Sequence, residues 1–181
     1  FGQSQPDSIR TFQSDFNHAP DLVSYPENEN DLITLYDFCE KSNVAIIPYG
    51  AGSSVVGGVT SDVGSKYNGT ISVNLSKFNK VLEVDDVSLS AKIQGGIRGP
   101  DLERSLKNYG LTLRHFPQSF EHSTLGGWIA TRSGGHFATL YTHIDDLVEN
   151  ISMISPNGKM NSLRVPGSGA GPSPDRFMLG S

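Results

Sequence analysis

The chain has 181 residues, of which 36% are hydrophobic and 18% are charged. This balance excludes a disordered chain, and no apolar stretch approaches the roughly 20 residues that cross a bilayer. The formal net charge of −5 and the pI near 5.4 argue against nucleic acid as the main partner. Because no secretion signal is recognisable, we expect a protein of the cytoplasm or of the periphery of a membrane.

Two segments have the periodicity of amphipathic helices. In the first, Asn30 opens a series of apolar residues spaced three or four apart, which Asn28 or Asn30 can cap and which Asn43 can end in a left-handed conformation. Cys39 lies within this pattern, so we interpret it as a small core residue rather than a nucleophile. As the only cysteine, it excludes a disulfide within the chain and fits a reducing compartment.

The second helix is predicted to start at residues 99–101, where a proline and an aspartate suit the first turn. Gly110 marks its end. We expect Leu102, Leu106 and Tyr109 to line its buried face, because they recur at helical spacing.

Extended or alternating patterns predict strands, and Asn157-Gly158 is a strong hairpin signal. The expected strands and extended pieces are residues 23–26, 44–47, 70–75, 81–84, 89–94, 111–114, 151–155 and 159–165. Helices and strands alternate irregularly and no repeat is present. The pattern therefore predicts an α+β fold with two subdomains, preceded by a polar extension over residues 1–19.

A glycine-rich run, PYGAGSSVVGG, extends from Pro48 to Gly58 directly after an apolar strand. Glycine adopts positive φ without steric cost, so successive backbone N–H groups can converge on one phosphate, assisted by the Ser53 and Ser54 hydroxyls. The run fits neither Walker A, which needs a lysine, nor the GxGxxG fingerprint, where Val55 occupies the third glycine position. An ordinary glycine-rich connection is the alternative.

A second segment, HFPQSFEHSTLGGWIATRSGG at residues 115–135, combines glycines, apolar residues and hydroxyls. Gly126 and Gly127 would let the backbone approach a flat ligand, and Trp128 and Ile129 would give apolar cover. Its other candidate groups are Ser119, Ser123, Thr124, Thr131, Ser133 and Arg132. A close backbone with a few placed polar groups is typical of a cofactor site.

The histidines give no indication of a metal site. No pair has the i, i+4 spacing of a helical ligand pair, and no cysteine or glutamate completes a ligand set. The five are His18, His115, His122, His136 and His143. We therefore expect no metal.

With these segments in order, the chain resembles the FAD-binding domain of the vanillyl-alcohol-oxidase flavoproteins, also called the PCMH type. PYGAGSSVVGG is similar to their pyrophosphate loop, and FPQSFEHSTLGGWIATRSGG is similar to the segment along the flavin. TLYTHIDDLVENISMISPNGKM resembles the strand and hairpin that follow. The string GGWIATR after FPQSFE is most similar to the branch of alkyldihydroxyacetonephosphate synthase and the bacterial FAD-linked oxidases that resemble it.

The resemblance implies bound FAD, and the absence of a histidine from the glycine loop implies that it is held non-covalently. The implied pyrophosphate contacts are Pro48, Tyr49, Gly50, Ala51, Gly52, Ser53 and Ser54. The implied ribityl and flavin contacts are Pro117, Gln118, Ser119, Ser123, Thr124, Gly126, Gly127, Thr131, Arg132, Ser133 and Gly134. Ile151 would lie near the adenine end.

Several of these side chains have two readings. Arg132 would stabilise negative charge on the flavin or on a substrate phosphate, or it would form an ion pair with Glu121 or with one acid of Asp145-Asp146. We interpret that acid pair as a helix cap rather than an acid–base pair. Trp128 would pack on the flavin or, as we favour, in the core.

The resemblance also implies that residues 20–181 are an FAD-binding domain, with subdomains at about 20–68 and 69–181. We expect it to be cut before the end of the flavin site and before a substrate-binding cap domain. The catalytic residues would then lie beyond this chain, and Arg132 and His122 are its only weak candidates, with His136 weaker still.

On this reading the chain is part of a flavoenzyme, inactive alone, that takes a small-molecule substrate through its cap domain and forms a homodimer when complete. One activity is alkyl transfer on a ketone phosphate, in ether-lipid metabolism. The alternatives are an FAD-linked oxidase or dehydrogenase of 2-hydroxy acids such as glycolate or D-lactate, and a non-catalytic FAD-binding module.

Overall fold

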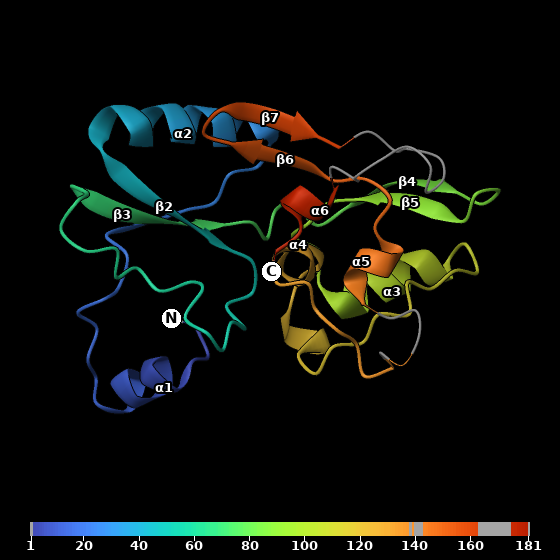
Figure 1. The fold of residues 1–181 in the computed structure, drawn as a ribbon, viewed down its shortest axis with the longest axis horizontal. Coiled ribbons are helices and arrows are strands. Elements are labelled where there is room, and N and C mark those ends of the chain that lie inside the picture. Colours follow the sequence, from blue (N-terminus) through green and yellow to red (C-terminus); the bar gives the residue numbers. More distant parts are fainter. Residues whose placement is uncertain (1, 138, 140–142, 163–174, 181) are drawn as a thin grey trace. The chain divides into compact units, whose positions relative to one another are not determined.

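The computed structural model describes residues 2–137, 139, 143–162 and 175–180 of the chain (Figure 1). The chain divides into two compact units, Phe1–Phe78 and Asn79–Ser181. The division therefore follows Phe78, whereas the sequence analysis placed it near residue 68. The physical reason is that the strand over residues 69–74 pairs within the sheet of unit 1.

Unit 1 is built on a three-stranded parallel sheet. Its strands are β1 (Leu22–Ser24), β2 (Val44–Tyr49) and β3 (Gly69–Asn74), in the order β1-β3-β2. Helix α2 (Glu29–Ser42) connects β1 to β2, and Figure 1 shows it along these strands. The glycine-rich run follows directly after the carboxyl end of β2.

The ends of α2 match the prediction. The Asn28 side chain accepts a hydrogen bond from the Asp31 N–H at 3.1 Å, and Asp31 bonds back to the Asn28 N–H. Asn43 ends the helix at φ 52°. Cys39 is buried with residues of β3, and burial raises the pKa of its thiol, which confirms the core interpretation.

Helix α1 (Gln5–Phe12) lies within residues 1–19, which were expected only as a polar extension. It begins with a capping box in which the Ser4 hydroxyl donates to Asp7 Oδ2 at 2.6 Å and accepts from the Asp7 N–H at 3.2 Å. Pro6 fits the first turn. The signal for this helix was therefore its cap and not an apolar face.

Unit 2 combines two antiparallel hairpins with short helices. The hairpin β4–β5 turns after Asp85, and the hairpin β6–β7 turns through Pro156 and Asn157, because Ser155 pairs with Gly158. The predicted hairpin is therefore present, but Gly158 begins β7 and is not a turn residue. Residues 163–165, the end of the strand predicted over residues 159–165, lie outside the described residues. The elements are β4 (Val81–Asp85), β5 (Ser90–Ile93), α3 (Gly99–Lys107), the 3₁₀ helix η1 (Phe120–His122), α4 (Leu125–Ala130), α5 (Ile144–Leu147), β6 (Ser152–Ser155), β7 (Gly158–Asn161) and α6 (Asp175–Met178).

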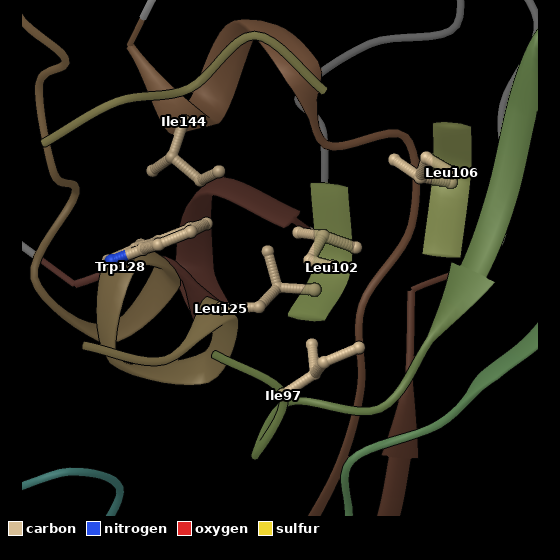
Figure 2. Close-up of a cluster of buried hydrophobic side chains, with 6 residues drawn as sticks. All are labelled: Ile97, Leu102, Leu106, Leu125, Trp128 and Ile144. Atoms are coloured by element: carbon tan, nitrogen blue, oxygen red, sulfur yellow. The ribbon is translucent and has the colours of Figure 1, made fainter. Parts of the chain in front are cut away.

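The core of unit 2 lies where α3, α4 and α5 meet. Figure 2 shows Trp128 of α4 and Ile144 of α5 close to the leucines of α3 and α4. Trp128 is only 3% exposed, so its interpretation as a core residue is confirmed. The cluster consists of Ile97, Leu102, Leu106, Leu125, Trp128 and Ile144.

Two expectations for the region after α3 are wrong. Tyr109 is 58% exposed, because α3 ends at Lys107 and its apolar face does not continue past that residue. Residues 111–114 form no strand, although the whole segment is described. The Glu103 carboxylate, rather than a neighbouring strand, accepts the N–H groups of Leu113 and Arg114.

Candidate cofactor-binding site

The glycine-rich run begins at the carboxyl end of β2 in unit 1. Gly52 is buried and has φ +72°, and a Cβ there would overlap the Tyr49 hydroxyl. Gly57 also has a positive φ of +75°. Side chains other than that of glycine are strained in this conformation, so glycine is favoured at these two positions.

The backbone of this loop presents a row of unpaired donors. None of the N–H groups from Gly50 to Gly57 donates a hydrogen bond to another described residue. The next one, of Gly58, bonds to Ser54 Oγ at 2.9 Å. Folded proteins rarely leave buried backbone donors unpaired, and donors at exposed positions bond to water or to a ligand. Successive free N–H groups at a glycine turn therefore fit an anion such as a pyrophosphate.

The side chains of the loop add little charge. Pro48, which makes up part of β2, is exposed, and Tyr49 and Ser53 are half-buried. Ser54 Oγ is already an acceptor for Gly58, so its own O–H is the group that can still donate. An anion here would be held by backbone dipoles and hydroxyls and not by a cation, because the loop has no Lys or Arg.

In unit 2, the hydroxyls of the second segment serve mainly the fold. Ser123 Oγ donates to the Ser119 carbonyl at 2.7 Å and accepts from Trp128 Nε1 at 2.6 Å. Thr124 caps α4 by accepting the Gly127 N–H at 3.3 Å. Thr131 donates to the Gly127 carbonyl. These bonds hold α4 in place, so the three hydroxyls are used within the fold of residues 119–131.

The two adjacent glycines differ in what surrounds them. The Gly126 N–H donates to the Gly95 carbonyl at 2.7 Å, and a Cβ on Gly126 would lie 2.9 Å from that oxygen. The close backbone approach expected toward a flat ligand is, at Gly126, an approach to Gly95. Gly127 is exposed, and its Cβ would meet only Thr124 Oγ1 at 3.2 Å. Gly127 therefore remains the open position of the pair.

Arg132 is the single cation of this segment, and Asp145 is its partner. Arg132 Nη2 lies 2.7 Å from Asp145 Oδ2, and this bond lowers the pKa of the Asp145 carboxyl. The ion pair therefore involves Asp145 and not Glu121. The Arg132 side chain is 48% exposed, which leaves its other N–H groups open to a ligand.

Of the other residues predicted to contact the cofactor, some are exposed and some are buried. Gln118 is exposed and makes no hydrogen bond to a described residue. Pro117 is buried, and its carbonyl accepts the Phe120 N–H. Ile151 is buried, its N–H donates to Ser162 Oγ at 2.7 Å, and its carbonyl accepts the Ser162 N–H at 2.9 Å.

The remaining positions flank α4, at η1 before it and in the segment after it. Ser119 and Ser133 are half-buried, Gly134 forms an isolated bridge with His143, and His122 and His136 are exposed. Loop 50–58 belongs to unit 1, whereas every predicted residue from 117 onward belongs to unit 2.

His115 is a residue of this segment that the sequence analysis treated only as one histidine among five. It is fully buried, its ring centroid lies 5.1 Å from that of Trp128, and its Nε2 lies 3.3 Å from Ser133 Oγ. It thereby ties the residues before η1 to those after α4. Nothing local in the sequence distinguishes it, because its burial depends on tertiary contacts.

The described residues were also considered as ligands for a metal and as membrane-spanning helices, and they fit neither role. No group of three or more His, Cys, Asp or Glu side chains in that part of the chain could hold a metal ion. Of the helices that the structure describes, none has the length and apolar character needed to cross a membrane.

A family model described as an FAD binding domain matches residues 20–164. Alkyldihydroxyacetonephosphate synthase of Dictyostelium discoideum is 39% identical to this chain over 181 residues, which is 100% of the chain and 29% of the synthase. A solved structure of an alkyldihydroxyacetonephosphate synthase has a TM-score of 0.88 at 39% identity, and the match covers 100% of this chain and 33% of that one.

A more distant relative is an oxidase. The glycolate oxidase subunit GlcD of Bacillus subtilis is 29% identical over 143 residues, which cover 79% of this chain and 29% of the subunit. The chain thus spans about a third or less of the length of each of these relatives. Its α+β architecture agrees with the fold expected from the sequence.

Proposed function

Because the chain belongs to the FAD binding domain family, we propose that the glycine loop of unit 1 binds the pyrophosphate of FAD. The observation that carries this proposal is the row of N–H groups from Gly50 to Gly57 without acceptors among the described residues. A pyrophosphate supplies several acceptor oxygens to such a row. The positive φ of Gly52 and Gly57 supports the same assignment, because it turns the backbone at those positions.

In unit 2, the groups proposed to contact the ribityl chain and the flavin are those left open. Gln118 offers an amide, Gly127 offers a surface without a side chain, and Arg132 offers guanidinium N–H groups. Asp145 fixes the guanidinium from one side, so Arg132 would direct its remaining donors to the flavin or to a substrate phosphate. When bound, FAD supplies the redox chemistry, and these residues bind and orient it.

We propose that FAD is held non-covalently. The loop from Pro48 to Gly58 contains neither histidine nor cysteine, the side chains that would form a bond to the flavin. Denaturation should therefore release all of the flavin into solution.

For the parent protein, we propose a flavoenzyme resembling alkyldihydroxyacetonephosphate synthase. The support is 39% identity over the whole chain and the string GGWIATR. The substrate would bind through a further domain, the complete enzyme would be a homodimer, and the chain alone would be inactive. The enzyme would act in the cytoplasm or at the periphery of a membrane.

The second candidate is an FAD-linked oxidase of 2-hydroxy acids, which the similarity to the glycolate oxidase subunit favours. Anaerobic addition of glycolate to the FAD-loaded complete protein separates the two. Loss of the flavin absorbance near about 450 nm would support the oxidase. An unchanged spectrum would support the synthase-like function.

The pyrophosphate site is tested by titrating the chain with FAD and following flavin fluorescence. Gly52→Ala and Gly64→Ala form a matched pair, because both glycines have φ +72°. A Cβ at Gly52 would overlap Tyr49, whereas a Cβ at Gly64 meets nothing within 4 Å. We expect Gly52→Ala to weaken FAD binding by about tenfold or more and Gly64→Ala to leave it unchanged.

The matched pair separates the geometry of the glycine loop from backbone strain, since both substitutions place an alanine at the same positive φ. Unchanged, wild-type affinity for FAD in both variants would contradict the site assignment. Equal losses in both would show that strain in unit 1, and not the loop itself, governs binding. Circular dichroism of each variant checks that the fold is retained.

A further inference from the structure

We infer that the N-terminal segment, residues Gly2–Phe12, orders the glycine loop and sets the direction of its N–H donors. The inference rests on the proposed pyrophosphate site and extends it to residues outside 20–164, the part that the family model matches. It also gives Ser54 a structural role, which is to hold the loop in place, beside the hydroxyl that it can offer to the ligand.

The main contact is a backbone hydrogen bond within unit 1. The Gln3 N–H donates to the Ser54 carbonyl at 2.8 Å. Ser54 is held a second time through its side chain, which accepts the Gly58 N–H at 2.9 Å. One residue in the middle of the loop is therefore fixed from the N-terminal segment and from the far end of the loop.

Peptide geometry turns this contact into an orienting device. The bond between Ser54 and Val55 is trans, as are all the described peptide bonds. In a trans peptide the carbonyl and the following N–H point in opposite directions. Since the Ser54 carbonyl points at Gln3, the Val55 N–H must point away from the N-terminal segment, where it makes no bond to a described residue.

The N-terminal segment is packed tightly enough to hold this position. Gly2 is buried, and a Cβ there would lie 3.0 Å from Asp7 Oδ2, 3.0 Å from Val59 Cγ2 and 3.1 Å from the Ser54 carbonyl. Asp7 is 1% exposed and locks the start of α1 through its capping box with Ser4. The donor at Gln3 therefore sits between two fixed neighbours, the buried Gly2 and the capped helix.

Gln3→Pro removes the N–H that holds Ser54 and tests the inference directly. Gln5→Pro is the matched control. Gln5 is exposed and occupies the first position of α1, where proline is favoured, and the preceding Ser4 already has the extended φ −67° and ψ 155° that proline requires. Both variants add one proline to the same segment, and only Gln3→Pro breaks the contact with the loop.

Two measurements are made on each variant of the full chain. Amide hydrogen exchange by NMR follows Gly58 and Thr60, whose N–H groups are bonded within the loop. Fluorescence titration follows the dissociation constant for FAD. In Gln3→Pro we expect faster exchange at both amides and FAD binding weaker by about fivefold to tenfold, the effect of one lost hydrogen bond. In Gln5→Pro we expect neither change.

Unchanged exchange in Gln3→Pro would overturn the inference, and so would faster exchange with unchanged FAD affinity. If the wild-type chain binds no FAD, the proposed function fails, and the exchange rates alone still decide whether the segment orders the loop. Should Gln3→Pro unfold, Gly2→Ala replaces it, because it keeps every N–H and displaces the segment through its Cβ. The same two changes are expected there, and their absence would overturn the inference.

Discussion

Arg132 and Asp145 join the end of α4 to the start of α5 through a hydrogen bond of 2.7 Å between Nη2 and Oδ2. Arg132 has φ 47°, a left-handed conformation that is unusual for arginine. The Asp145 side chain is 22% exposed, and its other oxygen, Oδ1, is buried without a partner among the described residues. The pair thus fixes the guanidinium of Arg132, the one Arg or Lys of residues 115–135, at the residue where the backbone turns after α4.

We predict that Asp145→Asn lowers the free energy of unfolding by about 1 kcal/mol near neutral pH, the upper range for a partly exposed ion pair. Because Arg132 lowers the pKa of Asp145 in the folded state, the stability that the charge contributes is present above the ordinary value of 3.8. It is lost as the pH falls through the lowered pKa. Urea unfolding of wild type and variant across this range measures the difference.

Asp146→Asn is the control for this prediction, because Asp146 is an exposed neighbour in the same turn. The difference between wild type and Asp145→Asn should vanish at low pH, while Asp146→Asn stays close to wild type throughout. A difference for Asp145→Asn that persists below the lowered pKa would contradict the ion-pair account.

Ser123 is predicted to matter for stability through Trp128. Ser123→Ala removes the acceptor for the Trp128 indole N–H, a bond of 2.6 Å within the core. A buried donor without an acceptor costs about 1–3 kcal/mol. Ser119→Ala is the control, since only the Ser119 backbone carbonyl, and not its hydroxyl, takes part in a hydrogen bond among the described residues. Thermal unfolding monitored by Trp fluorescence should separate the two, and equal midpoints would contradict the assignment.

The adjacent glycines of α4 should respond differently to alanine. Gly126→Ala places a Cβ 2.9 Å from the Gly95 carbonyl oxygen, and overpacking of this kind costs about 1–3 kcal/mol. Gly127→Ala meets only Thr124 Oγ1 at 3.2 Å and gains helix propensity of about 1 kcal/mol. We expect Gly126→Ala to be the less stable variant in urea unfolding. If Gly127→Ala were the less stable one, the close contact between Gly126 and Gly95 would be contradicted.

Much of unit 1 follows from local sequence signals. Asn28 and Asn43 mark the ends of α2 because caps use short side chains and left-handed backbone, and both properties can be read from single residues. The glycine loop was found in the same way. Helix α1 is hard to predict, because its polar sequence shows no apolar face and only the cap at Ser4 indicates it.

The candidate site in unit 2 could be located from the sequence. The sequence does not separate the residues that would contact a ligand from those that stabilise the fold. A hydroxyl that contacts a ligand and one that accepts an indole N–H have the same sequence signature, so Ser123 was assigned to the cofactor. Gly126 was assigned there too, because a glycine needed for contact with Gly95 cannot be told from one needed for a ligand. Such roles depend on partners distant in sequence, as does the burial of His115.

The backbone N–H groups from Gly50 to Gly57 are proposed to bind the pyrophosphate of FAD. The most direct test is a ¹H–¹⁵N NMR titration of the chain with FAD, with riboflavin, which has no phosphate, as the control ligand. The account predicts that these amides shift downfield with FAD and saturate with it, and that riboflavin leaves them in place. Saturable binding of FAD with the loop amides unmoved would contradict it.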